Sequence, residues 1–245
     1  NNRPHAGEAA AAPLLASFSV PAQAHDAVQR LCAGLGPGPF SRVVLFVSPL
    51  ADLPRLCAGL AACFPPGLVI GCTTAGEIAQ HGYTEGEIVA LGFPAAQFST
   101  ACLLVPDLTR IDPQALIGRL IRARATLQHD QPGWDHEFAF MMVDGLSMLE
   151  DDLAAAVASG LGPVPLFGGS AADGVRFGQT HVVWQERALT NAAIVMLVRS
   201  DCRVRVFNLD HLLPTDRRMV VTQADPARRI VRQINAEPAA REYAR

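Results

Sequence analysis

The chain has 245 residues, of which 50% are hydrophobic and 18% charged, and its formal net charge is -3. This composition is typical of a globular protein and excludes the disordered class, which has few apolar residues and a high net charge. The slightly acidic balance argues against nucleic acid as a partner, and all 20 basic residues are Arg, which excludes lysine-based catalysis.

No membrane partner is expected, because no apolar run reaches the roughly 18 residues that a transmembrane helix needs. Asn1–Pro13 has no apolar core behind a basic start, so no signal peptide is expected and the predicted location is the cytoplasm. Six cysteines are present without any C-x-x-C pair, which argues against a cysteine metal site and covalent haem attachment. Most of them are expected to be small buried hydrophobic residues.

Residues 1–41 are expected to form a flexible lead-in and a first helix. Arg42–Val47 is a continuous apolar run, which predicts a strand buried on both faces, and a helix is expected over Leu53–Phe64. The next strand, Leu68–Ile70, leads into a loop of small residues, Gly71–Glu77. The rest of this half is predicted to contain strands Glu87–Phe93 and Phe98–Val105 and then a helix over Pro113–Gln128 that is capped by Asp112.

The second half follows a similar plan. A strand over Glu137–Val143 precedes a helix over Met148–Ser159, and strand Val164–Phe167 leads into a second small-residue loop, Gly168–Gly174. Later predicted elements are strands His181–Trp184, Ala192–Val198 and Arg203–Leu209 and a helix over Ala227–Asn235. The spacing from the first strand to the glycine loop is nearly equal in the two halves, with Gly71 matching Gly168 or Gly169, which indicates an internal duplication.

The predicted fold is therefore α/β, with a mixed sheet or sheets built from two duplicated β-α-β-loop-β units and helices packed on them. The expected boundaries place one domain over residues 42–223, with halves at about 42–135 and 136–223, and a further portion over residues 224–245.

The two glycine loops are the candidate ligand site, and duplication predicts that they lie close together around one cavity. They lack the G-x-G-x-x-G and G-K-[ST] patterns of nucleotide-binding loops. Small residues allow backbone amides to approach a ligand, while the alternative is tight packing where the two units meet. Glu77 and Asp173 either bind a ligand ammonium group or cap backbone donors. The candidate ligand-binding residues are Gly71, Cys72, Thr73, Thr74, Glu77, Gly169, Ser170 and Asp173. Signature motifs of hydrolases and metalloproteases are missing, so no enzyme is predicted.

Three segments, GCTTAGEI at Gly71–Ile78, GYTEGEIVALGF at Gly82–Phe93 and FGGSAADG at Phe167–Gly174, resemble the FIST family of bacterial sensory domains. The likeness extends from about Arg42 to the end, and Ile234–Tyr243 resembles the start of the FIST C-terminal portion. Within the family, His211–Tyr243 is most similar to nitric-oxide-sensing proteins. That resemblance implies bound haem b and regulation of a histidine kinase or of a cyclic-di-GMP enzyme (diguanylate cyclase or phosphodiesterase). For FIST domains more broadly, it implies small ligands such as amino acids.

Haem bound without covalent attachment needs an axial ligand, an apolar slot and cations for its propionates. His211 is the first candidate ligand, because it follows a predicted strand and precedes leucines, with Arg217 and Arg218 available for the carboxylates. His81 and His181 are the next candidates. Two functions therefore stay open, a haem-based nitric oxide sensor and a receptor for a small polar metabolite, either of them a possible homodimer.

Overall fold

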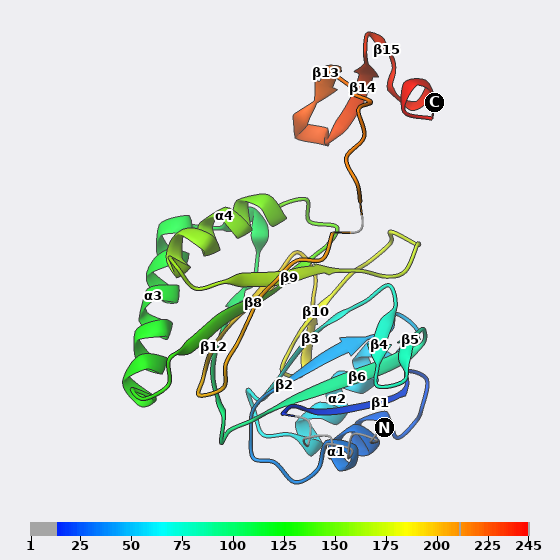
Figure 1. The fold of residues 1–245 in the computed structure, drawn as a ribbon. Coiled ribbons are helices and arrows are strands. Elements are labelled where there is room, and N and C mark those ends of the chain that lie inside the picture. The colour runs from blue at the N-terminus through cyan, green and yellow to red at the C-terminus, as the bar shows by residue number, and fades with distance from the viewer. Residues whose placement is uncertain (1–13, 211, 245) are drawn as a thin grey trace, which may run out of the picture. The chain divides into compact units, whose positions relative to one another are not determined.

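The computed structural model describes residues 14–210 and 212–244. Described residues up to Val206 form one compact unit, and those from Phe207 onward form a second. The first unit contains two sheets (Figure 1). The six-stranded sheet has the order β1 (Ala16–Pro21), β6 (Glu87–Pro94), β2 (Phe40–Val47), β3 (Val69–Thr73), β10 (Val182–Trp184), β11 (Arg187–Leu189). The four-stranded sheet has the order β7 (Phe98–Val105), β12 (Ala193–Ser200), β8 (His136–Asp144), β9 (Leu166–Ala171).

Both sheets are mixed, which confirms the predicted α/β class. The pairs β2–β3 and β8–β9 are parallel and the other pairs are antiparallel. Each parallel pair is joined by a helix, as a crossover between parallel strands requires. These helices are α2 (Leu53–Cys63) and α4 (Glu150–Leu161).

The helices cover the outer faces of the two sheets. Alternate strand residues such as Val43 and Leu45 pack against α1 (Ala27–Leu35) and α2. On the other sheet Ala139 and Val195 belong to the cluster formed with α3 (Pro113–Asp130) and α4. The Asp112 side chain accepts a hydrogen bond from the backbone N–H of Ala115, which confirms the predicted cap of α3.

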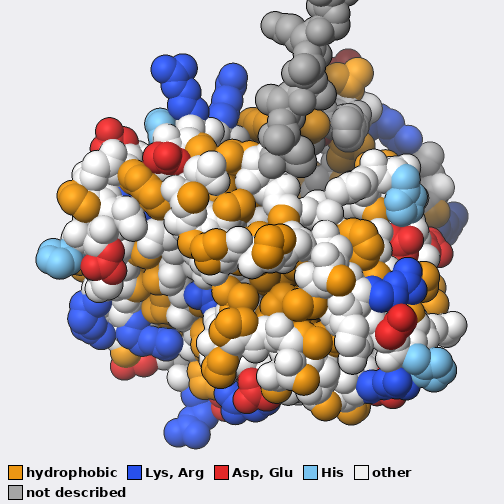
Figure 2. Space-filling model, turned by 90° about the horizontal axis from the view of Figure 1, so that it is seen from below, with side chains coloured by type: hydrophobic (Ala, Val, Ile, Leu, Met, Phe, Trp, Pro, Cys, Tyr) orange, Lys and Arg blue, Asp and Glu red, His pale blue; other side chains and the backbone are white. Residues whose placement is uncertain are grey.

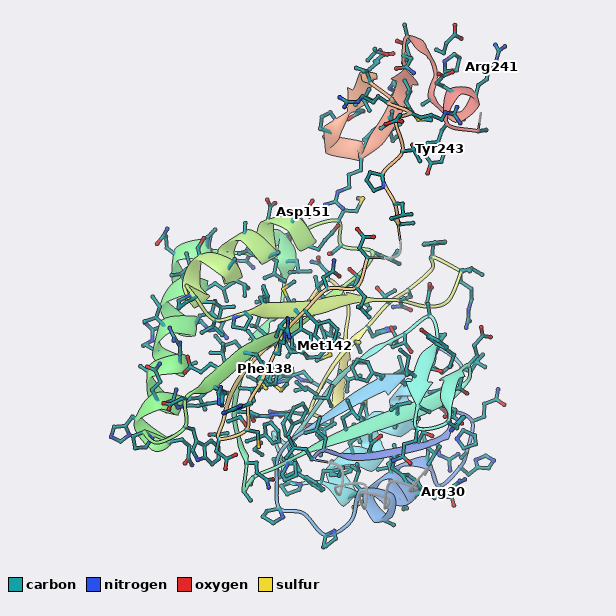
Figure 3. All side chains as sticks on the ribbon, in the orientation of Figure 1. Arg30, Phe138, Met142, Asp151, Arg241 and Tyr243 are labelled. Carbon is teal, nitrogen blue, oxygen red and sulfur yellow. The ribbon has the colours of Figure 1, made fainter. Side chains whose placement is uncertain are left out.

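The inner faces of the sheets pack on each other and form a third hydrophobic core. Ile70 from the first sheet and Ile194 from the second are fully buried in it, and Phe138 and Met142 of β8 lie in the same core (Figure 3). The rings of Phe46 on β2 and Phe140 on β8 meet edge to face with centroids 6.3 Å apart. The unit therefore has four layers in the order helix, sheet, sheet, helix.

The duplication is visible in the topology. Strands β1-β6-β2-β3 of the first sheet correspond in order, direction and connecting helices to β7-β12-β8-β9 of the second. The repeats therefore begin at Ala16 and Phe98, and the elements Phe98–Val105 and Pro113–Asp130 open the second repeat. Strand β1, in the region predicted to be a lead-in and a first helix, pairs with β6. The β10–β11 hairpin comes from the second repeat yet extends the first sheet through β3.

Four sequence predictions about local structure are wrong, namely the two glycine loops, one strand and one helix. Gly71–Thr73 lies within β3 and Gly168–Ala171 within β9, so the two strands run further than their apolar residues indicate. Residues 203–209 have no strand partner. Alternating burial is found only over residues 203–206, where Val204 and Val206 pack on the inner core, because Phe207 and Leu209 are 68% and 70% exposed.

The predicted helix Ala227–Asn235 is likewise absent. A short 3-10 helix, η2 (Pro226–Arg228), ends at Arg229, whose φ of 52° is left-handed, and β14 (Ile230–Ile234) follows. This strand pairs with β13 (Val221–Asp225) and β15 (Glu237–Pro238), and α5 (Ala239–Tyr243) completes the second unit. The pairing with β13 places Ile230–Ile234 in a hairpin rather than in a continued helix.

The remaining elements are the short hairpin β4 (Glu77–Ala79) and β5 (Gly82–Thr84) and the 3-10 helix η1 (Leu108–Arg110). Within the described part of the chain, every helix is too short or too polar to cross a membrane. Apolar side chains also reach the surface, and Figure 2 shows them gathered at the centre of one face with charged side chains around them.

Candidate functional site

The segments that follow β3 and β9 lie against each other, as duplication predicts. The backbone N–H of Ala172 donates to the carbonyl of Thr73 at 2.9 Å, and the N–H of Thr73 donates to the carbonyl of His181 at 2.9 Å. The Thr73 hydroxyl accepts from the N–H of His181 at 3.0 Å. The predicted proximity is therefore confirmed, but the cavities described below are lined by residues outside Gly71–Glu77 and Gly168–Gly174.

Two glycines of these segments are required by close strand packing. A Cβ at Gly71 would lie 2.4 Å from the carbonyl oxygen of Leu45, and one at Gly168 would lie 2.0 Å from that of Met141. Leu45 and Met141 are the residues directly opposite on the parallel neighbouring strands, so Gly168 is the equivalent of Gly71. Gly169 meets no atom within 4 Å. Gly71 and Gly168 are therefore explained by the close packing of parallel strands in each duplicated unit.

The carboxylates of the two segments bind groups of the protein itself. Glu77 is 3% exposed, and its carboxylate accepts from the Thr74 hydroxyl at 2.5 Å and from the N–H of Glu87 at 3.2 Å. Asp173 accepts from the backbone N–H groups of residues 177, 178 and 179, which lowers the pKa of its carboxyl group. Both side chains therefore cap backbone donors, and their binding of a ligand stays a prediction, as it does for Ser170.

Cys72 is buried, and desolvation raises the pKa of its thiol to about 12. The thiol is therefore protonated at neutral pH, whereas a cysteine ligand of haem iron binds as the thiolate. Asp144, at the end of β8, is a buried carboxylate that the sequence analysis missed. It accepts from the N–H of Leu146, the hydroxyl of Thr180 and the N–H of Asn191 and so holds three chain segments together.

The described residues do not fit a haem. His211 lies outside them, and Leu212 and Leu213, which were expected to line an apolar slot, are 82% and 89% exposed. Arg217 and Arg218 are also exposed. Of the other candidates, the His81 side chain is 61% exposed, and His181 is half-buried with a pKa lowered by desolvation. Haem binding stays a prediction, and no chemistry is derived from it. Among residues 14–210 and 212–244, no group of three or more His, Cys, Asp and Glu side chains could hold a metal ion.

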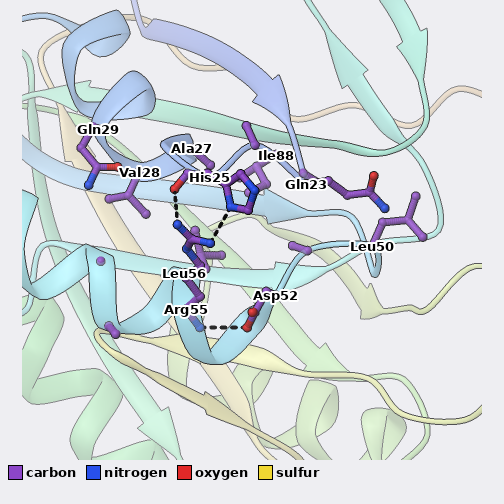
Figure 4. A pocket seen from close by; sticks show the side chains of 15 residues that line it. Gln23, His25, Ala27, Val28, Gln29, Leu50, Asp52, Arg55, Leu56 and Ile88 are labelled. Carbon is purple, nitrogen blue, oxygen red and sulfur yellow. Dashed lines mark hydrogen bonds between the residues drawn. The ribbon is translucent and has the colours of Figure 1, made fainter.

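A cavity of about 450 Å³ lies where β1 leads into α1 and β2 leads into α2 (Figure 4). Its volume is within the range of small-molecule sites. Buried apolar side chains from four elements or connections form part of its wall, and polar side chains stand around them. The apolar group is Ala22, Val28, Leu56 and Ile88, and the polar group is Gln23, His25, Gln29, Asp52 and Arg55.

Arg55 is the cation of this cavity, and His25 holds it in place. One guanidinium nitrogen, Nη1, donates to Nδ1 of His25 at 2.7 Å, and the other, Nη2, donates to the His25 carbonyl at 2.9 Å (Figure 4). Because the guanidinium group has no acceptor, Nδ1 of His25 accepts in this contact. Asp52 supplies the opposite charge nearby and caps α2 through the N–H of Arg55 at 3.0 Å.

The first turn of α1 adds a second attraction for anions. Ala27, Val28 and Gln29 line the cavity, and the residue before them, Asp26, makes no side-chain hydrogen bond to the helix end. The first N–H groups of a helix lack partners within it, although that of Ala27 donates to the carbonyl of Ala24 at 3.2 Å, and the helix dipole places partial positive charge there. The cavity therefore combines a positioned guanidinium group, helix N–H groups, one carboxylate and an apolar wall, which suits a small molecule that bears a carboxylate.

Sequence reasoning missed this cavity, because His25 and Arg55 are 30 residues apart and match no motif. The only local signal is Asp52 followed by Pro54, which predicts where a helix begins and not what lies in front of it.

The chain belongs to the FIST family, since the FIST N domain matches residues 41–237. FIST domains are sensory and signalling domains, so the coarse functional class follows from this match. A comparison with curated proteins finds no significant match.

Proposed function

We propose that this FIST domain senses a small metabolite with a carboxylate group, such as an amino acid, in the cavity between the N-terminal ends of α1 and α2. The observation that supports this best is the pairing of Arg55 with His25 beside an uncapped helix end in a space of about 450 Å³. A carboxylate would accept from the guanidinium group and the α1 N–H groups, and Asp52 would attract an ammonium group. No step of this proposal involves catalysis.

The signal is proposed to pass to a histidine kinase or to a cyclic-di-GMP enzyme, as the resemblance of the sequence implies. Binding energy can shift the protein between states only if the ligand contacts differ between them. The walls of the cavity belong to α1 and α2, which pack on each other, so a ligand in it would contact both helices.

The test is a calorimetric titration with a panel of amino acids, each compared with its carboxamide. The expected result is that at least one amino acid binds and that its amide binds more weakly. Arg55→Gln should weaken binding about tenfold to a hundredfold, the usual worth of a hydrogen bond to a charged group. Arg122→Gln, at an exposed position of α3 outside the cavity, is the matched control. Equal affinity of both variants for the ligand would exclude the cavity.

The haem alternative is tested on the same protein by adding haemin and following the Soret band. A band that His211→Ala abolishes would favour the nitric oxide sensor, with the cavity of Arg55 left for another role. No band, together with amino acid binding that depends on Arg55, would favour the metabolite receptor.

A further inference from the structure

Cys32 and Cys63 lie together at the opposite end of the same two helices. The Sγ of Cys32, on α1, donates to the carbonyl oxygen of Cys63, the last residue of α2, at 3.5 Å. The carbonyl and the thiol belong to the same residue, and rotation about the Cys63 Cα–Cβ bond changes the distance between the two sulfurs. The proximity of Cys32 also raises the pKa of the Cys63 thiol, although burial raises it more.

Small reactants have access to both thiols. Cys32 and Cys63 are half-buried, as are Cys102 and Cys202, whereas Cys57 and Cys72 are buried. The two accessible cysteines line a cavity of about 420 Å³ whose other walls include Gly36, Pro39 and Leu68. Accessible thiols with a second cysteine beside them form reversible disulfides, and a lowered pKa speeds the reaction, whereas buried thiols are inert. The raised pKa of the Cys63 thiol therefore slows its oxidation without preventing it.

We propose that Cys32 and Cys63 form a reversible redox pair that joins α1 to α2. The oxidant is a peroxide. The thiolate of one cysteine attacks a peroxide oxygen, the O–O bond breaks, and a sulfenic acid and water are formed. The second thiolate then attacks that sulfur, the S–O bond breaks, and a second water leaves as the S–S bond forms. Two thiols have lost two electrons and two protons, and one hydrogen peroxide has become two waters.

The consequence of the disulfide follows from the direction of the helices. Helix α1 connects the end of β1 to the start of β2, and α2 connects the end of β2 to the start of β3. Because these strands run in the same direction, the two helices also run side by side in the same direction. The cysteines are near their C-terminal ends, and His25 and Arg55 are near their N-terminal ends. Oxidation therefore fixes the separation of the two helices that form the Arg55 cavity. The inference stands on the cysteine geometry and does not depend on what that cavity binds.

The test treats the full chain with hydrogen peroxide, counts free thiols under denaturing conditions and maps disulfides by mass spectrometry. The expected result is a loss of two of the six thiols, a cross-link between the Cys32 and Cys63 peptides, and recovery of both thiols with dithiothreitol. Cys32→Ser and Cys63→Ser should each abolish the cross-link. Cys202→Ser, which removes another half-buried thiol, should leave it unchanged.

The thermal unfolding midpoint of each variant shows whether the variant is folded. The peptide map of the chain without substitutions tests the proposal even if a variant fails to fold. Six free thiols after peroxide treatment would overturn the proposal. So would a cross-link that involves a different cysteine, or one that joins two chains on a non-reducing gel.

Discussion

Glu137 on β8 holds two arginines in the outer face of the second sheet. Its carboxylate accepts from Arg199, directly opposite on β12, at 2.7 Å, and from Arg124 on α3 at 2.6 Å. Arg199 is only 9% exposed and also donates to the carbonyl of Gln131 at 2.8 Å. We expect Glu137→Gln to keep the shape of the side chain but to leave the Arg199 charge buried without a counter-charge.

Loss of one partner of a buried ion pair costs about 3 to 5 kcal/mol. Glu137 is 12% exposed, so the lower end applies, and we expect the free energy of unfolding to fall by about 3 kcal/mol. Arg124→Gln is the matched comparison, because it leaves Glu137 paired with Arg199 and removes a side chain that is 30% exposed. Its expected cost is about 1 kcal/mol, the upper value for an accessible pair.

The contribution of Glu137 also depends on pH. Burial alone would raise the pKa of its carboxyl group, but hydrogen bonds from Arg124 and Arg199 and the charge of Arg124 outweigh burial and lower it. A carboxyl group whose pKa is lower in the folded state stabilises the protein above its unfolded pKa of about 4.3 and loses that effect as pH falls further. The original chain and Glu137→Gln should therefore differ fully at neutral pH and converge in strong acid.

Urea unfolding followed by tryptophan fluorescence measures this quantity. The two tryptophans, Trp134 and Trp184, both belong to the unit that ends at Val206, so the signal reports that unit. A loss below about 1 kcal/mol for Glu137→Gln, or a difference that persists unchanged in acid, would refute the role assigned to the ion pair.

Other outcomes follow from single contacts. Gly168→Ala should destabilise the first unit by about 3 kcal/mol in urea unfolding, because its Cβ would meet a backbone carbonyl, and Gly169→Ala should change little because nothing lies near it; equal effects would contradict this. Native protein at pH 8 should leave Cys72 unreacted with a thiol reagent, since it is buried and desolvation raises its pKa to about 12. The half-buried Cys202, whose pKa desolvation and Asp201 also raise, should react faster, and rapid labelling of Cys72 would argue against its burial. Asp173→Asn should speed hydrogen exchange at the amides of residues 177–179, and in the original chain the same amides should lose protection as acid protonates Asp173, whose pKa these hydrogen bonds lower; unchanged exchange would show that the carboxylate does not hold this loop.

Continuous apolar runs and helix caps were enough to predict most elements of the first unit. Arg42–Val47, Glu137–Val143 and Ala192–Val198 are strands in the structure, because central strands covered by a helix layer on one side and a second sheet on the other are apolar on both faces. The α3 helix was located from Asp112 and Pro113, since capping is a local interaction. The duplication was detectable as well, because two copies of one topology require small residues where parallel strands approach closely.

Local patterns failed where the partner of a segment is distant. Ile230–Ile234 has residues compatible with a helix, and only its pairing with β13 makes it a strand. Val204 and Val206 alternate as in a strand, yet they cover the inner core without backbone pairing. Strand β1 depends on the unpaired edge of β6, which lies far along the chain.

The sequence by itself determined the α/β class, the duplicated plan and the family, because these depend on periodicity, caps and short motifs that neighbouring residues share. Only the tertiary structure decided that Glu77 and Asp173 cap backbone donors, and that the cavity lies elsewhere, at His25 and Arg55. The reason is physical: a cavity is the space left when separate helices pack on a sheet. Which residues line it depends on the directions of those helices and not on the spacing of residues along the chain.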